Sequence, residues 1–326
     1  MKSNKLGLLT TKIGSGITPR GGQSVYQDSG THLIRSQNIY NHKFKKNGLV
    51  CISQEIAEKM KSVEIIKEDV LINITGDSVA RVYLVPDEVL PARVNQHVCI
   101  LRTTPEFNPH YLYYFLINPI TQNHLLSIAG IGGTRNALTK EILYNLIIEY
   151  PDYPTQQKIV KQLNAIKNKI IVLQNQNHTL EQMAQAIFQS WFVDFDGVTE
   201  FEDSELGKIP KGWNVKKIGE VIELLYGKSL TKENRVHGNI PVYGSSGIVG
   251  FHNQSLSTKK GIIVGRKGNV GSVYLSSNSF YAIDTVYYVK TELSLHYVYR
   301  NFQNQNFINS DSSVPGLSRD QAYSLP

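Results

Sequence analysis

The sequence is poor in the features on which several protein classes depend. Its 326 residues hold only two cysteines, Cys51 and Cys99, and neither belongs to a CxxC pair, which excludes a disulfide scaffold and indicates a reducing compartment. No apolar run approaches the ~18 residues of a membrane span, and the N-terminal MKSNKLGLLTTK lacks the apolar core of a signal peptide. We therefore expect a soluble, cytoplasmic chain with no membrane partner.

The charge balance allows an anionic partner. The formal net charge is +7, and 41% of the residues are hydrophobic, which is a globular value. A moderate basic excess is compatible with nucleic acid binding without proving it. At this length the chain can hold two cores joined by a linker.

One segment has the periodicity of a long helix. From PTQQKIVKQL to QAIFQSW, apolar residues recur at alternating steps of four and three, and Asn177 fills the one gap. Such a heptad seam predicts a coiled-coil helix of about 37 residues and ~55 Å, in which a buried Asn fixes the register. The predicted seam consists of Ile159, Leu163, Ile166, Ile170, Leu173, Asn177, Leu180 and Ile187.

Four short stretches before this helix have echoes after it, in the same order. KLGLL (5–9) matches KIGEV (217–221), VARVYL (79–84) matches VGSVYL (270–275), HYLYYF (110–115) matches HYVYRN (296–301), and ALTKE (137–141) matches GLSRD (316–320). Four ordered echoes indicate an internal repeat.

Within each copy, short β-rich runs such as DVLINITG and GIIVGR alternate with turn residues and short capped helices. We therefore predict an α/β (α+β) fold with two repeated mixed domains joined by a long coiled-coil helix. The predicted boundaries are residues 1–153 for the first domain, 154–193 for the helix, 194–206 for an acidic linker, and 207–326 for the second domain, which GKIPKGW opens.

No catalytic or metal-binding constellation emerges from the sequence. Nine histidines lack metal spacing, and DFDGVTEFEDSE has Thr199 where a calcium loop needs Gly. NPHY (108–111) resembles the substrate loop of amino-methyltransferases, which would make the chain an enzyme. Its counterpart in the second copy is SLHY, and no Gly-rich nucleotide-binding turn precedes it, so a helix cap is favoured.

Basic and amide side chains cluster in both copies. Arg, Asn and Gln can read base edges in the major groove, while Lys mostly contacts phosphates. The candidate DNA-binding residues are Arg20, Gln23, Arg35, Gln37, Asn38, Lys43, Lys45, Lys46 and Arg135 in the first copy, and Lys259, Lys260, Arg266, Lys267 and Asn269 in the second.

Several motifs resemble those of the specificity subunits of type I restriction-modification systems. These motifs are SWFVDFD followed by SELGKIPKGWNVKKIGEV, the helix entry YPDYPTQQKIVKQL, and the copy ends GIGGTRNALT and VPGLSRDQAYSLP. The resemblance implies two target recognition domains, each of which reads half of a bipartite double-stranded DNA sequence, with the helix as a spacer.

The resemblance also implies that this chain is not an enzyme and binds no cofactor itself. In that family the helices dock methyltransferase subunits, which carry S-adenosylmethionine and methylate adenine. Restriction subunits, which are motors that use ATP and Mg²⁺, join the same complex.

The family pattern has a second helix after the second domain, whereas this sequence stops at Ser324-Leu325-Pro326. We therefore expect a bare seam on the helix that can also support self-association. A truncated, inactive or inhibitory specificity fragment is the main alternative to a working subunit, and a DNA adenine methyltransferase is the less favoured one.

Overall fold

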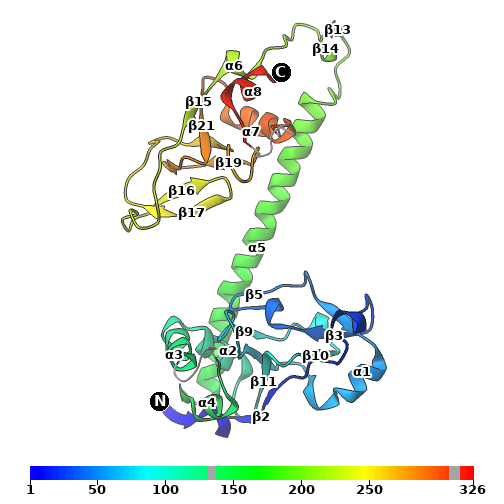
Figure 1. Ribbon diagram of the computed structural model, residues 1–326, viewed down its shortest axis with the longest axis vertical. Helices are drawn as coiled ribbons and strands as arrows, with labels where there is room; N and C mark the ends of the chain where they lie inside the picture. Colours follow the sequence, from blue (N-terminus) through cyan, green and yellow to red (C-terminus); the bar gives the residue numbers. More distant parts are fainter. Residues whose placement is uncertain (131–136, 308–315) are drawn as a thin grey trace. The chain divides into compact units, whose positions relative to one another are not determined.

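The computed structural model describes residues 1–130, 137–307 and 316–326. The chain divides into two compact units, Met1–Leu173 and Gln174–Pro326, and the division falls inside a single helix. Figure 1 labels the elements of both units.

The first unit has two four-stranded sheets, one of order β2-β11-β8-β9 and one of order β6-β3-β10-β7. Its strands are β1 (Lys2–Lys5), β2 (Thr10–Ser15), β3 (Thr31–Ile34), β4 (Ile39–Tyr40), β5 (Lys43–Phe44), β6 (Val50–Ile52), β7 (Glu64–Ile65), β8 (Val70–Asn73), β9 (Val82–Leu84), β10 (Ala92–Val94), β11 (Val98–Thr103) and β12 (Ile147–Tyr150). Its helices are α1 (Gln54–Lys59), α2 (Pro109–Ile117), α3 (Pro119–Ala129), α4 (Lys140–Asn145) and the first part of α5 (Tyr153–Phe192).

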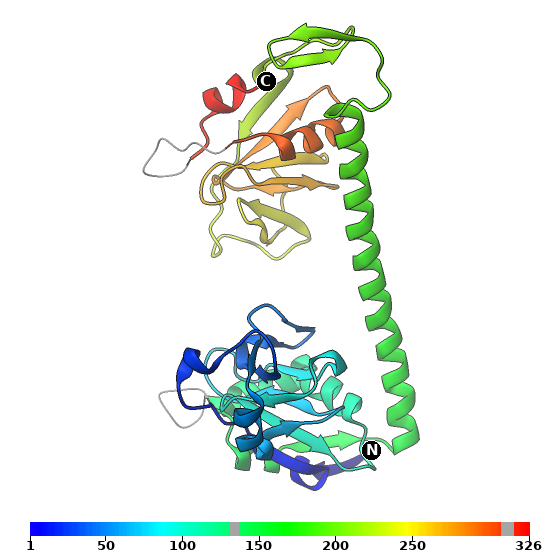
Figure 2. The same cartoon turned by 90° about the vertical axis from the view of Figure 1, so that its right-hand side faces the viewer.

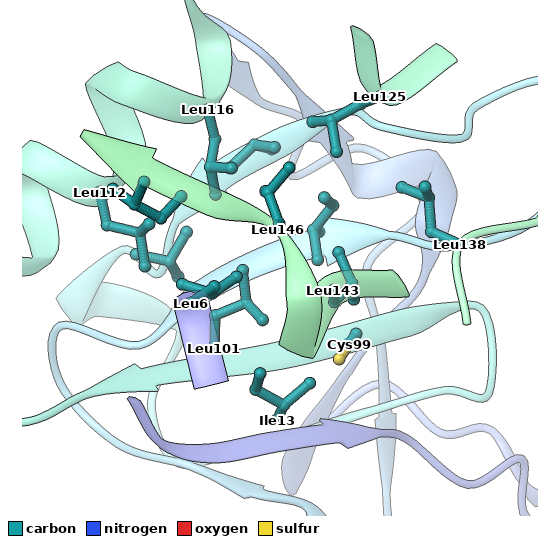
Figure 3. Close-up of a cluster of buried hydrophobic side chains, with 14 of the residues drawn as sticks. Leu6, Ile13, Cys99, Leu101, Leu112, Leu116, Leu125, Leu138, Leu143 and Leu146 are labelled. Carbon is teal, nitrogen blue, oxygen red and sulfur yellow. The ribbon is translucent and has the colours of Figure 1, made fainter. Parts of the chain in front are cut away.

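Strand β8 has apolar side chains on both of its faces because it separates two cores. Val70 and Ile72 point into a core that α2, α3 and α4 cover, while Leu71 points into a second core toward the other sheet. Side chains alternate along a strand, so a continuous apolar run such as VLI fits a strand buried on both faces. Figure 3 shows the helix-side core, where Leu112 and Leu143 meet strand and turn residues.

The second unit has the same plan. Its strands are β13 (Phe201–Ser204), β14 (Gly207–Pro210), β15 (Ile222–Tyr226), β16 (Ile240–Gly244), β17 (Gly247–His252), β18 (Gly261–Gly265), β19 (Val273–Ser276), β20 (Tyr281–Ala282) and β21 (Val286–Thr291), and its helices are the end of α5, α6 (Ile218–Val221), α7 (Leu295–Asn304) and α8 (Arg319–Ser324). The antiparallel sheet β15-β21-β18-β19 corresponds to β2-β11-β8-β9, and a second sheet again contains one parallel pair, β16 with β20. The predicted mixed α/β repeat is confirmed.

Helix α5 is one uninterrupted helix of 40 residues, as the heptad pattern predicts (Figure 2). It packs on the first unit through Gln156 and Val160 and on the second through Phe188, all of which are buried. The predicted seam starts beside these contacts and then leaves them: Ile159 and Leu163 are half-buried, while Ile166, Ile170, Leu173, Asn177, Leu180 and Ile187 are exposed. Ile166 and Leu180 are each 60% exposed, which leaves an apolar stripe open to solvent.

The acidic stretch 194–206 contains a strand. Its second half forms β13, which pairs antiparallel with β14 from GKIP, so residues 201–210 are a β-hairpin. The Glu200 carboxylate binds the Lys211 ammonium at 2.8 Å, and Glu202 accepts a hydrogen bond from the Gly212 backbone at 3.1 Å. Pairing with a basic neighbour strand therefore gives this acidic segment a structure that its composition does not reveal.

One glycine in each copy stands where two backbones nearly touch. A Cβ on Gly16 would lie 2.1 Å from the Val94 carbonyl oxygen, and a Cβ on Gly227 would lie 1.9 Å from the Ile283 carbonyl oxygen. Neither backbone can move away without disturbing its sheet, so only glycine fits.

We expect Gly16→Ala to destabilise the first domain by about 1–3 kcal/mol, because the added methyl overlaps backbone atoms. Thermal unfolding measures the change. Gly14→Ala, two residues earlier in β2, is the matched control, since its Cβ would have no neighbour closer than 3.7 Å. An equal melting temperature for the two variants would contradict the close approach.

Among the described helices, none combines the length and the apolar character that crossing a bilayer requires.

Candidate nucleic-acid interface

The same two segments meet in each copy and enclose a pocket. In the first copy the Leu138 N–H donates to the Ile74 carbonyl at 2.8 Å, and in the second the Leu317 N–H donates to the Arg266 carbonyl at 2.9 Å. The loop that leaves β8 or β18 then turns at a glycine with positive φ, Gly76 in one copy and Gly268 in the other. These backbone contacts place the start of α4 or α8 against that loop.

The pocket of the first copy has a volume of about 640 Å³, and most of its lining residues have polar side chains. Hydroxyl and amide groups line it, and the Thr75 hydroxyl lies 2.6 Å from His97 Nδ1. On its wall the Arg81 guanidinium stacks on the Tyr40 ring, 4.5 Å from the ring centre. The lining residues are Ser36, Gln37, Tyr40, Thr75, Gly76, Asp77, Ser78, Arg81, His97 and Ala137.

The corresponding pocket of the second copy, about 420 Å³, is cationic and aromatic. Arg319 and Arg266 both stack on the ring of Tyr226, at 4.6 and 5.0 Å from its centre. Lys267 also lines the pocket. Guanidinium groups and an exposed ring together can bind phosphates and stack on bases.

The tyrosines of this pocket perturb each other. The interaction with Tyr287 is the main cause that lowers the pKa of the Tyr226 hydroxyl, and Arg319 and Arg266 add to the effect. Burial raises the pKa of Tyr287 to about 12, and its hydroxyl donates to the Leu317 carbonyl at 3.0 Å. Tyr287 is thus buried and fixed by this hydrogen bond, while Tyr226, which is 46% exposed, faces solvent.

The candidate residues of the first copy fall into three groups. Gln37 lines the pocket. Arg20, Gln23, Lys43, Lys45 and Lys46 are exposed on the segments from residue 20 to β6, and the Lys46 ammonium pairs with Glu88 at 3.3 Å. Arg35 is held by its own loop, since its Nη2 donates to the Gly48 carbonyl at 2.6 Å and its guanidinium stacks on Tyr26. Arg135 lies outside the described residues.

Asn38 differs from the exposed candidates because it is buried. Its side chain is fully buried, accepts from the Arg35 N–H at 2.9 Å and donates to the Lys45 carbonyl at 2.9 Å. These bonds use the amide to fix the shape of the loop, so Asn38 cannot contact a base in this structure.

Strand β18 separates the candidate DNA-binding residues of the second copy into two groups. Arg266, Lys267 and Asn269 follow its C-terminal end, where the pocket lies, and Asn269 donates to the Ser246 hydroxyl at 3.2 Å. Lys259 and Lys260 precede its N-terminal end, so the two groups lie roughly 20 Å apart. These five residues are close in the sequence but therefore do not form one cluster on the surface.

Arg81, Tyr40 and His97 in the first pocket, and Tyr226 and Arg319 in the second, were not among the candidates. The repeated motifs could have pointed to two of these residues, because Arg81 lies in VARVYL and Arg319 lies in GLSRD.

The structure assigns the NPHY segment to a helix start. The Asn108 side chain accepts from the Tyr111 N–H at 3.1 Å and caps α2, as predicted. Within the ranges that the structure describes, no three His, Cys, Asp or Glu side chains converge in a way that could hold a metal ion.

Comparison with known proteins agrees with the repeat. The family model of the type I restriction modification DNA specificity domain matches residues 17–182 and again residues 210–321. The chain is 35% identical over 123 residues to the specificity subunit of the type I restriction enzyme MjaIX of Methanocaldococcus jannaschii, and 41% identical over 91 residues to that of HindI of Haemophilus influenzae. These matches cover 36% and 28% of this chain but only 28% and 20% of the two relatives.

A solved structure shares the fold. The crystal structure of a type I restriction-modification S subunit from M. genitalium aligns with 99% of this chain and 83% of its own, with a TM-score of 0.54 and 15% identity. Because the family model matches both copies, and so most of the chain, the chain belongs to the family of type I restriction modification DNA specificity domains.

Proposed function

We propose that the chain is the DNA-recognition subunit of a type I restriction-modification complex and is not itself an enzyme. The observation that carries this proposal is the pair of pockets built by the same backbone contacts in both copies. The first is lined by one arginine, one glutamine and several hydroxyls, and the second by two arginines and a lysine, as suits two domains that read different half-sites.

Base contacts in this proposal come from the pockets. Gln37 and Arg81 in the first domain and Arg266 and Arg319 in the second project bidentate groups that suit base edges. The exposed lysines on the surrounding loops and those before β18 supply phosphate contacts, which add affinity without sequence preference.

The partners follow from the same proposal. The exposed seam of α5 docks methyltransferase subunits, which bring S-adenosylmethionine, and restriction subunits with ATP and Mg²⁺ join the assembly in the cytoplasm. In this proposal the chain itself binds no cofactor. Its helix is one continuous element, and we propose that it fixes the gap between the half-sites.

Co-expression with the cognate methyltransferase, followed by mapping of methylated adenines across the host genome, tests the function. We expect a bipartite motif with one fixed gap, because two different pockets read the two halves. A palindromic motif would assign recognition to one domain used twice by a dimer. Absence of methylation, with activity restored when a second heptad helix is appended, would favour the inactive-fragment alternative.

A further inference from the structure

The pocket of the second domain brings together groups of opposite charge. Three cations line it, Arg266, Lys267 and Arg319, and the carboxylate of Asp320 lines it beside them. Within the ranges that the structure describes, no ion pair joins Asp320 to any of the three. Phosphates repel a carboxylate, so on a wall that faces DNA an unpaired carboxylate needs a hydrogen-bond donor from a base.

The ring of Tyr226 fixes the position of both guanidinium groups. Arg319 lies 4.6 Å and Arg266 lies 5.0 Å from the centre of this ring. Arg266 is held further by the bond from its Nη1 to the Asp284 carbonyl at 3.1 Å. Because the two groups share one ring, they reach the same base pair of a bound duplex or neighbouring pairs.

The described lining of this pocket contains no group suited to adenine. A bidentate contact with adenine takes a side-chain amide, which Gln37 offers in the first pocket, but none of the described lining residues of the second is Asn or Gln. Two of its hydroxyls are engaged: Ser318 accepts from the Gln321 N–H at 3.2 Å, and Tyr287 donates to a backbone carbonyl at 3.0 Å. The groups that can read a base pair are therefore mainly cationic donors and one carboxylate.

We propose that the second pocket recognises a G·C base pair. In the major groove guanine presents the acceptors N7 and O6, which match two parallel N–H groups of Arg319. The paired cytosine presents its N4 donor, which matches the Asp320 carboxylate. Adenine would instead place its N6 donor against the guanidinium. This inference rests on the proposed DNA recognition and names the base pair that the second domain selects.

The test uses the full chain assembled with its methyltransferase and the target duplex found by methylation mapping. Each guanine of the target is replaced in turn by 7-deazaguanine, which has a C–H in place of N7 and still pairs with cytosine. We expect the affinity to fall at least about fivefold at one guanine or more of one half-site, because the bidentate contact is lost.

Variants assign this sensitivity to the pocket. In Arg319→Ala, guanine and 7-deazaguanine should bind alike at the sensitive position. Lys140→Ala is the matched control, because Lys140 in ALTKE is the counterpart of Arg319 in GLSRD, and it should keep the full sensitivity. Asp320→Ala should weaken the discrimination between G·C and A·T at the same position, and an unchanged discrimination would overturn the role of the carboxylate.

Arg319→Lys separates a base contact from a phosphate contact. Lysine keeps the charge but not the planar fork, so this variant should lose the sensitivity as the alanine variant does. Sensitivity retained in both variants would overturn the assignment of the guanine contact to Arg319. Specific binding that no 7-deazaguanine weakens would overturn the G·C proposal alone, whereas equal binding of target and scrambled duplexes would overturn the proposed function with it.

Discussion

Arg266→Ala is expected to weaken binding of the target duplex by about 1–3 kcal/mol and to relax the preference at one half-site only. The Arg266 guanidinium stacks on Tyr226 inside the second pocket, where its Nη1 donates to the Asp284 carbonyl at 3.1 Å. We expect the N–H groups that this bond does not use to contact a base edge. Binding of the assembled subunit to duplexes altered in one half-site or the other measures both effects.

Lys259→Ala is the matched control in the same domain. Lys259 lies before β18, at the end of the strand away from the pocket, so its loss should weaken all sequences alike and lower the salt dependence by about one counterion. Arg266→Lys, which keeps the charge but not the planar fork, should behave like the alanine variant. If Lys259→Ala changed the sequence preference and Arg266→Ala did not, the pocket would not be the reading site.

The double substitution Ile166→Glu with Ile170→Glu is expected to abolish capture of the methyltransferase while leaving the fold intact. The two side chains are 60% and 50% exposed, so their loss removes little from the core of the isolated chain. In the complex each glutamate would be buried without a partner, and a loss of about 100-fold or more in affinity follows. Co-purification measures the loss, and thermal unfolding of the free chain checks the fold.

Asn168→Glu with Asn175→Glu is the control, since it adds the same charges on the exposed face away from the seam. This control variant should still co-purify with the methyltransferase. Undiminished capture by the Ile166 and Ile170 variant would show that the partner docks elsewhere. A wild-type dimer that this variant converts to a monomer would instead assign the seam to self-association.

Features that depend on local periodicity could be predicted from the sequence. The steps of four and three from Ile159 to Ile187 predict α5, and the ordered echoes predict a second domain of the same topology. Both signals are carried by side chains close in sequence, where geometry follows from the helix or strand period.

Features that depend on contacts between segments far apart in the sequence could not be predicted in this way. The hairpin of β13 and β14 is local, but the acidic residues of β13 are uncommon in strands and so conceal its pairing. The second pocket combines Tyr226, Arg266 and Arg319 from three distant segments, whereas Lys259 and Arg266, close in sequence, lie at opposite ends of β18. Only the paired strands decide which of these residues meet.

The backbone origin of both pockets has a consequence for how such a protein diversifies. The bonds from Leu138 to Ile74 and from Leu317 to Arg266 join main-chain atoms, so they place no demand on the side chains that line the pockets. Substitutions at positions such as 37, 81 or 319 then alter the lining without altering the frame. If the chain has the proposed function, the DNA sequence that each domain recognises can therefore change by point substitution in that domain, while the backbone frame of the pocket is kept.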